Sequence, residues 1–235
     1  MTTGPATGTL EASQVRAMFD RIAGVYDRMN SVMTAGMHHR WRARAADLAD
    51  VGPGDTVLDV ATGTGDLALE LARRVGPTGV VVGSDFSEQM LALARRKAPD
   101  MTWEWGNALE LAYDDDRFDA VIVGFGARNF ADLDRGLAEM TRVTRPGGMV
   151  VVLEITTPSK PPLSTFFSAW FDRVVPLIGK FAGDADAYAY LPNSVKRFPG
   201  PHELAQRLSS AGLEDVRYLL TAGGIIAIHA GRKPQ

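Results

Sequence analysis

A glycine-rich turn between an apolar strand and a helix restricts the fold more than any other feature of the sequence. The strand is predicted over Thr56–Val60, the turn carries Gly63 and Gly65, and a helix follows over Asp66–Val75. Glycines let a chain turn sharply and approach a ligand closely, and a helix N-terminus offers unpaired N–H groups to an anion. The unit predicts a ligand site at the carboxyl edge of a parallel sheet. A turn that holds no ligand is the alternative interpretation.

Strands and helices continue to alternate after this unit, which predicts an α/β fold with right-handed βαβ crossovers. The further strands are predicted over Val80–Ser84, Met101–Trp105, Phe118–Val123 and Met149–Ile155, and the helices over Ser87–Ala98, Leu133–Val143 and His202–Ala211. Two closing strands, at about 216–221 and 225–229, are joined by so few residues that they must be antiparallel.

The remaining segments predict one domain over residues 1–235, with additions at two places. Residues 1–12 read as a disordered leader, and helical spacing of apolar residues over 13–50 predicts a helical cap. Residues 156–201 are rich in proline and aromatic side chains and predict a helical insert, which we interpret as a lid over the substrate.

Composition excludes several classes of function. The 235 residues include no cysteine, which rules out disulfides and thiolate catalysis, and the net charge of −3 does not suggest a nucleic-acid partner. No histidine pair has convincing metal-binding spacing, so no metal is expected. No apolar run approaches the roughly 20 residues that span a bilayer. A cytoplasmic protein is expected, and peripheral contact with the inner face of the membrane and a homodimer both stay open.

Two carboxylates near the turn point to the kind of cofactor. Asp85 ends the second strand and follows Gly65 at the distance typical of a residue that binds both ribose hydroxyls of an adenosine cofactor. A helix cap is its alternative role, but Ser87 is the better cap. Asp59, at the end of the first strand, suits the ammonium group of a methionine moiety and would repel a pyrophosphate.

Other residues complete the predicted cofactor site. Thr62, Gly63 and Gly65 are the loop contacts, and Asn107 with Ala108 follows the third strand, where an adenine ring needs a polar edge and a small neighbour. A Pro-Gly-Gly turn at Pro146–Gly148 separates a helix from an apolar strand. Together these features favour S-adenosylmethionine (SAM) over a nicotinamide dinucleotide, which remains the different-class alternative as a cofactor of an oxidoreductase.

At these residues the chain resembles class I SAM-dependent methyltransferases, which implies a Rossmann-like, seven-stranded, mostly parallel sheet with an antiparallel last strand. Its flanks resemble the ubiquinone/menaquinone biosynthesis C-methyltransferases. The motifs that carry this resemblance are Tyr26–Asn30, Gly36–Arg42, Gly124–Asn129, Asp184–Leu191 and Leu220–Gly231. Two positions depart from the family pattern: His39 stands where an arginine is usual, and Gly124 where a serine is frequent.

The resemblance implies methylation of a ring carbon of a polyprenyl quinol, and the chain is most similar to the menaquinone branch, in which demethylmenaquinol becomes menaquinol. Methylation of a benzoquinol ring in ubiquinone synthesis, methylation of another small molecule, and a catalytically silent binding module are the alternatives. On this interpretation Arg128 stabilises the phenolate or polarises a water, Asn129 orients the second ring oxygen, and Tyr26 covers the pocket. A surface ion pair of Arg128 with Asp132 or Asp134 is the structural alternative.

The aromatic insert is the predicted contact for the prenyl tail. Apolar residues at helical spacing run from Phe166 to Phe181, and packing of a helix on the sheet would explain most of them. The sharper hypothesis places the tail along this stripe. Trp170, Asp184 and Tyr188 are then the candidate substrate-binding residues.

Overall fold

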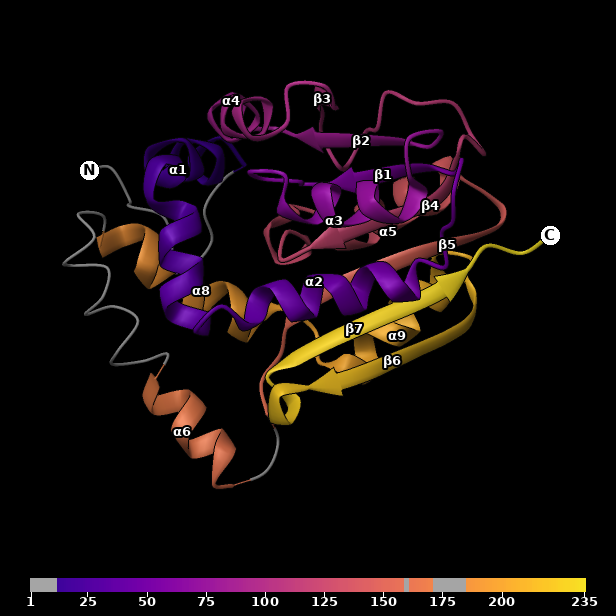
Figure 1. The fold of residues 1–235 in the computed structure, drawn as a ribbon. Coiled ribbons are helices and arrows are strands. Elements are labelled where there is room, and N and C mark those ends of the chain that lie inside the picture. The colour runs from indigo at the N-terminus through magenta and orange to yellow at the C-terminus, as the bar shows by residue number, and fades with distance from the viewer. Residues whose placement is uncertain (1–11, 159–160, 171–184) are drawn as a thin grey trace, which may run out of the picture.

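Seven strands form one sheet in the computed structural model, which describes residues 12–158, 161–170 and 185–235 (Figure 1). Their order across the sheet is β3-β2-β1-β4-β5-β7-β6, and β7 runs antiparallel to both of its neighbours. The strands are β1 Thr56–Val60, β2 Val80–Asp85, β3 Thr102–Trp105, β4 Phe118–Gly124, β5 Thr144–Ile155, β6 Glu214–Thr221 and β7 Ile226–Arg232. The predicted α/β fold and antiparallel last strand are confirmed, although β7 lies between β5 and β6 and not at the edge.

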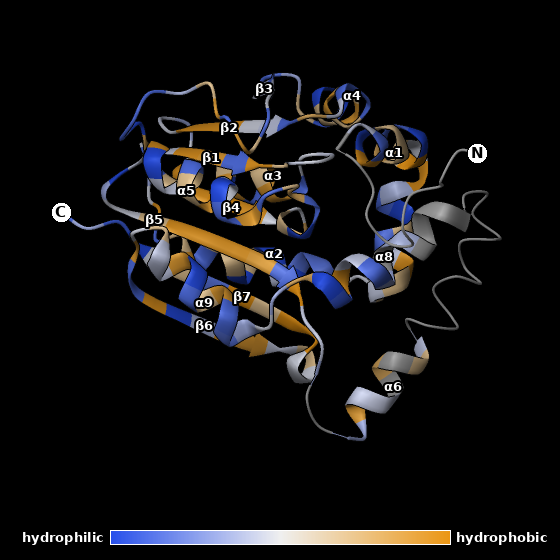
Figure 2. Cartoon of the chain, turned by 180° about the vertical axis from the view of Figure 1, so that it is seen from behind, coloured by the Kyte–Doolittle hydropathy of each residue, from blue (hydrophilic) through white to orange (hydrophobic). Residues whose placement is uncertain are grey.

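Helices cover both faces of the sheet, as short, nearly continuous apolar strands require (Figure 2). Alternate residues of each strand point to opposite faces, so Val57 joins the core under α2, α3 and α4, while Leu58 joins the core under α5 and α9. These helices are α2 Met37–Leu48, α3 Asp66–Val75, α4 Glu88–Lys97, α5 Leu133–Val143 and α9 Pro201–Ser210.

Three further described helices, which belong to the predicted cap and insert, lie near the carboxyl ends of the parallel strands (Figure 1). They are α1 Ala12–Thr34, α6 Leu163–Ala169 and α8 Ala185–Arg197. The region predicted as a cap therefore has two parts, because α2 contributes Ala45 and Ala46 to the sheet core and α1 does not. Most of the predicted leader and part of the insert lie outside the described residues.

The predicted turn at Pro146–Gly148 differs in detail from the structure. The helix before it ends at Val143, and β5 begins at once with a bulge where the pairing shifts between Phe118 and Ala120 of β4. Gly147 takes the expected positive φ of 77° inside this bulge. Among the described residues, no helix combines the length and apolarity needed to cross a membrane.

Candidate functional site

The two glycines of the turn after β1 have different structural roles. Gly65 has a φ of +86°, and a Cβ there would meet the ring of Trp103 at 2.4 Å, so it allows the loop to pack against β3. Gly63 has a φ of +59° and no neighbour that an added Cβ would meet within 4 Å. The loop is therefore fixed at Gly65 and leaves open space above Gly63, as a bound ligand requires.

Asp59 is a buried carboxylate with unused hydrogen-bonding capacity. Its side chain is 1% exposed, Oδ2 accepts a hydrogen bond from Thr62 Oγ1 at 2.6 Å, and Oδ1 is buried with no partner among the described residues. Burial raises the pKa of Asp59 to about 7. A buried carboxylate oxygen without a partner is costly, and a cationic group of a ligand would remove that cost.

Asp85 joins the loops that follow β1 and β2. Its Oδ2 accepts a hydrogen bond from Gly63 N at 2.8 Å and its Oδ1 accepts one from Ser87 N at 2.9 Å. Ser87 caps α4 by accepting a hydrogen bond from Met90 N, so the predicted cap is confirmed. The ligand role of Asp85 stays a prediction. Burial raises the pKa of Asp85 to about 6.

A pocket of about 100 Å³ lies above these groups. All seven predicted cofactor residues are near it or line it: Asp59, Thr62, Gly63, Asp85, Asn107 and Ala108 line the pocket, and Gly65 shapes its loop. Asn107 uses Oδ1 to accept a hydrogen bond from Leu109 N at 3.0 Å, which holds its loop and leaves the amide N–H₂ as a donor. A carboxylate for an ammonium, a carboxylate for a ribose and an amide for a base edge thus line one pocket, which fits SAM.

Arg128 lies in η1 (Ala127–Asn129), directly after β4, and forms a buried ion pair. Its Nη1 contacts Glu154 Oε1 at 2.8 Å and also donates to Phe125 O, and the two side chains are 8% and 1% exposed. The alternative of a surface pair is wrong, because Asp132 caps α5 and Asp134 binds Arg207 at 2.9 Å. Burial alone would lower the pKa of Arg128, but its interactions with Glu154, Tyr26 and Tyr190 together outweigh burial, and the pKa lies above its ordinary value.

The guanidinium of Arg128 has a donor to spare. Its Nε is buried and has no hydrogen-bond partner among the residues that the structure describes. Arg128 lines a second, larger cavity of about 400 Å³, whose walls are mostly apolar, so the guanidinium adjoins this space. A permanent cation there can stabilise a developing negative charge, but it cannot serve as a base.

The larger cavity is shared between the N-terminal helices, the carboxyl edge of the sheet and the insert. It shares four lining residues with the cofactor pocket, so the two spaces adjoin: Phe19, Tyr26, Arg42 and Phe125. Tyr26 is thus placed at the junction, as the covering role predicts. Asn129 lines the cofactor pocket and not the larger cavity, and its Oδ1 accepts a hydrogen bond from Tyr190 Oη at 3.2 Å.

Trp170 and Phe167, from the insert, line the larger cavity, and the contact of Trp170 with a prenyl tail stays a prediction. The backbone of Tyr188 belongs to α8, while its side chain is outside the described part of the structure. Asp184 and the stripe from Phe171 to Phe181 also lie outside the described residues. The predicted roles of Asp184 and Tyr188 therefore stay predictions.

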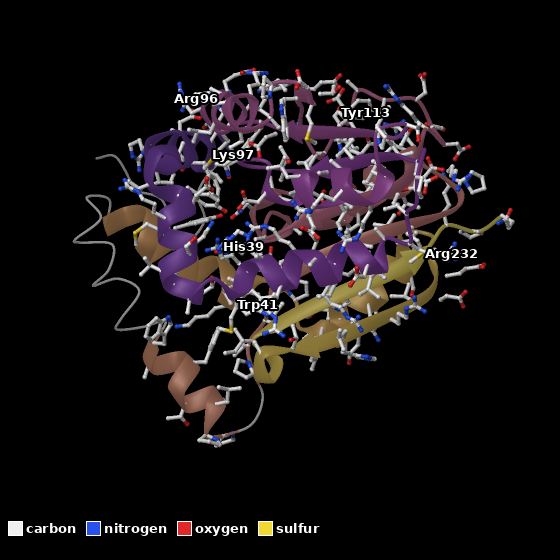
Figure 3. The ribbon with its side chains drawn as sticks, in the orientation of Figure 1. His39, Trp41, Arg96, Lys97, Tyr113 and Arg232 are labelled. Carbon is white, nitrogen blue, oxygen red and sulfur yellow. The ribbon has the colours of Figure 1, made fainter. Side chains whose placement is uncertain are left out.

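The two adjacent histidines of α2 separate into a buried and an exposed residue. His38 is 3% exposed and lines the larger cavity, whereas His39 is exposed on α2 (Figure 3). Both could approach a cation together with Asp66. However, His38 bonds Ser31 and Arg42, and Asp66 pairs with Lys97 at 2.7 Å. These ligand atoms are therefore already engaged by hydrogen bonds and cations.

Sequence reasoning missed Glu154, whereas it named Tyr190, with Asp184 and Tyr188, as a residue that could line the head-group side. Glu154 offered a signal, because it is the single charged residue in the apolar segment Met149–Ile155 and an unpaired charge is rarely buried. His229 also lies in an apolar strand but is structural, since its Nε2 contacts Pro201 O at 2.8 Å. The partner of Glu154 is 26 residues away, so the sequence alone does not reveal the pair.

Comparison of the sequence with known families gives one match over nearly the whole chain. The ubiE/COQ5 methyltransferase family matches residues 7–233. A demethylmenaquinone methyltransferase from Thermus thermophilus is 45% identical, and the match covers 92% of this chain and 100% of that protein. A ubiquinone/menaquinone biosynthesis C-methyltransferase from Geobacter sulfurreducens is 40% identical over 96% of this chain and 90% of that protein.

Solved structures share the fold at low sequence identity. The [4+2]-cyclase SpnF superposes with a TM-score of 0.69 at 20% identity, covering 98% of this chain and 99% of that one. A SAM-dependent methyltransferase from Thermotoga maritima, described as a possible histamine N-methyltransferase, gives a TM-score of 0.66 at 19% identity over 92% of this chain and 98% of that one. Identities this low establish the class I methyltransferase fold and no substrate.

Proposed function

The chain belongs to the ubiE/COQ5 methyltransferase family, and we propose that it transfers the methyl group of SAM to a ring carbon of demethylmenaquinol, giving menaquinol. Membership of a methyltransferase family overturns the alternative of a nicotinamide-dependent oxidoreductase. The observation that supports the proposal is Arg128: a buried cation, with no hydrogen-bond partner on Nε among the described residues, that lines a mostly apolar cavity adjoining the cofactor pocket.

Residues of the small pocket would hold SAM. Asp59 receives the ammonium group of the methionine moiety, Asp85 the ribose hydroxyls, and Asn107 and Ala108 the adenine edge and face. Thr62 and Gly63 supply the loop that follows the cofactor, and Gly65 fixes its shape. When bound, SAM supplies an electrophilic methyl group, so the reaction needs no metal to activate it.

The quinol ring would lie in the larger cavity, which we call the quinol cavity. The ring is the weaker reaction partner, and the polar residues of this cavity act on it. The guanidinium of Arg128 would bind a ring oxygen and stabilise the phenolate that forms when the hydroxyl loses its proton to water. Negative charge on that oxygen increases the electron density on the neighbouring carbon. This carbon would form the new C–C bond as the S–CH₃ bond of SAM breaks and S-adenosylhomocysteine leaves with that electron pair, and it would then lose its own proton to water, which restores the aromatic ring. A positioned donor of this kind contributes about 10²–10³-fold to the rate.

Tyr26 and Asn129 position the reactants. Tyr26 lines both spaces and separates the ring from solvent, which strengthens the charge interaction at Arg128. Asn129 reaches the large cavity through Tyr190, whose Oη donates to Asn129 Oδ1, so it would orient the second ring oxygen through that hydroxyl. Holding the ring carbon in line with the methyl group can supply roughly 7–11 kcal/mol of the barrier reduction.

The prenyl tail would leave the ring along the apolar side of the cavity, past Trp170 and Phe167. Val32 is 68% exposed and Met37 45% exposed, and both line the cavity at the turn between α1 and α2. Exposed apolar residues at this turn support peripheral contact with the inner face of the membrane, where such tails reside. We propose a cytoplasmic protein that makes this peripheral contact. Cosedimentation with liposomes tests the contact.

A homodimer is proposed through β6, which is an edge strand. Tyr218, Leu219 and Leu220 on this strand are 41%, 37% and 48% exposed. A second copy of the strand would cover them and pair the exposed backbone edge. Sedimentation of the protein with and without a charged substitution at Leu220 tests this pairing, and a native monomer would contradict it.

The quinones of cells that lack the protein test the proposed substrate. The proposal predicts accumulation of demethylmenaquinone, with recovery of menaquinone when the native chain is restored. Recovery should fail with a folded Arg128 variant. Accumulation of an unmethylated benzoquinone instead would favour the ubiquinone branch, and an unchanged quinone profile would overturn both assignments.

A further inference from the structure

Helix α1 carries two carboxylates that bind the rim of the cofactor pocket. Asp20 Oδ1 accepts a hydrogen bond from Ser87 Oγ at 2.5 Å, and Asp27 Oδ1 accepts one from Thr64 Oγ1 at 2.6 Å. The two aspartates lie two helical turns apart and therefore share one face of the helix. Ser87 and Thr64 belong to the loops after β2 and β1, so α1 is tied to both loops that form the pocket.

Lys97 strengthens the second of these contacts. Its Nζ lies 2.7 Å from Asp27 Oδ2, 2.7 Å from Asp66 Oδ1 and 2.9 Å from Thr64 Oγ1. Figure 3 shows Lys97 where α4 approaches α1. The lysine thus joins α4, the start of α3 and the glycine-rich loop to α1. Its side chain is 29% exposed, and ion pairs that solvent can reach are weak enough to open and close.

The apolar face of α1 borders the larger cavity and packs on other helices, not on the sheet. Met18 is the buried centre of a small cluster with Phe19, Ile22 and Tyr190, separate from the two cores on the sheet faces. Phe19 and Tyr26 line both the cofactor pocket and the larger cavity. An element with few contacts to the main core opens at lower free energy than the strands do, as is typical of lids.

We propose that Asp20 and Asp27 are positioning residues that hold α1 closed over the loaded cofactor pocket, and that the closed helix completes the quinol cavity. The inference rests on the proposed function for the identity of both ligands. Cofactor exchange then requires these contacts to open, and opening removes one wall of the quinol cavity. SAM therefore binds before the quinol, and S-adenosylhomocysteine (SAH) leaves after the methylated product.

The test compares Asp20→Ala/Asp27→Ala with the native enzyme and with Asp47→Ala. The control also removes an aspartate from a helix and breaks an ion pair at the surface, Asp47 with Arg74 at 2.7 Å. Asp47 lines neither the cofactor pocket nor the larger cavity. The double variant should release SAH about five- to tenfold faster in stopped-flow displacement and raise the quinol KM by a similar factor. Its kcat should change less than about threefold, and Asp47→Ala should match the native enzyme.

A second readout separates latching from a general loss of stability. SAH should protect the amides of α1 from hydrogen exchange in the native enzyme and in Asp47→Ala, but not in the double variant. Asp27→Asn should show part of the protection that the double variant lacks. Unchanged SAH release and unchanged protection in the double variant would overturn the proposal. If the native chain transfers no methyl group to demethylmenaquinol, the proposed function fails, but SAH release and amide protection still decide whether the two aspartates hold α1.

Discussion

The cofactor pocket and the quinol cavity differ in what builds them. The pocket is smaller and more polar, and most of its walls are loops at the ends of parallel strands, held by local bonds such as Thr62 to Asp59 and Ser87 to Asp85. The cavity is about four times larger, with walls from α1, α2, the sheet edge and the insert. On the proposed function, rigid local structure would hold the cofactor, while segments distant in sequence would enclose the tailed quinol.

The division predicts that residues of one region affect one ligand. Arg128 lines only the quinol cavity, so its loss should slow catalysis without weakening cofactor binding. Because removing one partner of a buried pair costs about 3–5 kcal/mol of stability, the informative variant is Arg128→Ala/Glu154→Gln. We expect kcat to fall about 10²–10³-fold, with the calorimetric Kd for SAH unchanged. Glu154→Gln alone keeps the cation at this cost in stability, so it is the control when it is assayed well below its Tm; near-native kcat in the double variant would contradict the role of Arg128.

Asp59 should show the opposite behaviour. Asp59→Asn keeps an acceptor for Thr62 but loses the charge, so SAH should bind about ten- to hundredfold more weakly at pH 8, while the quinol KM stays the same. Its Tm should not fall, because ionising a carboxyl whose pKa burial has raised costs stability above the unfolded pKa. An equal rise in the Kd for SAH and in the quinol KM would show that the two regions are not separate.

The pH dependence of SAH binding sharpens the same comparison. Burial raises the pKa of Asp59 to about 7, so the carboxyl becomes neutral as the pH falls through 7 and no longer attracts an ammonium group. Affinity should therefore fall as the pH decreases from 8 to 6, with Asp85 adding to the loss near its pKa of about 6. The Asp59→Asn variant should lose the part of this dependence centred near pH 7; a native affinity that is flat over the range would contradict the assignment.

Trp170 should affect only the part of the substrate that lies in the cavity. Trp170→Ala removes apolar surface, and at roughly 25 cal/mol per Å² the lost contact should raise the KM for a tailed quinol about five- to tenfold. A tail-less naphthoquinol should be used as efficiently as by the native enzyme, and SAH affinity should not change. Equal effects on tailed and tail-less quinols would place the tail elsewhere.

Gly124→Ser should have the smallest effect. A Cβ at this position would meet Leu67 Cδ2 at 2.8 Å, and the end of a leucine side chain can move. Because Gly124 lines the cofactor pocket and not the cavity, a change of up to about threefold is expected in the SAH Kd, with a small loss of Tm. A larger change in the quinol KM than in the SAH Kd would weaken the division between the regions.

The same difference explains what the sequence could predict. The cofactor half follows from short motifs: the strand before Gly63, Asp85 at the next strand end and Asn107 at the third lie together because carboxyl ends of parallel strands meet at one edge. The antiparallel final pair follows from turn length. The cavity depends instead on contacts between distant segments, such as Arg128 with Glu154 and Asp27 with Lys97, and no local pattern specifies which side chains will pair.

The most direct test of the central claim is a transfer assay with the purified protein, SAM carrying a deuterated methyl group and demethylmenaquinol in detergent, followed by mass spectrometry of the quinone. The account predicts one labelled methyl group on the naphthoquinol ring, formed by the native enzyme and lost in Arg128→Ala/Glu154→Gln despite native SAH affinity. An enzyme that binds SAH and transfers no label to the naphthoquinol would contradict the account.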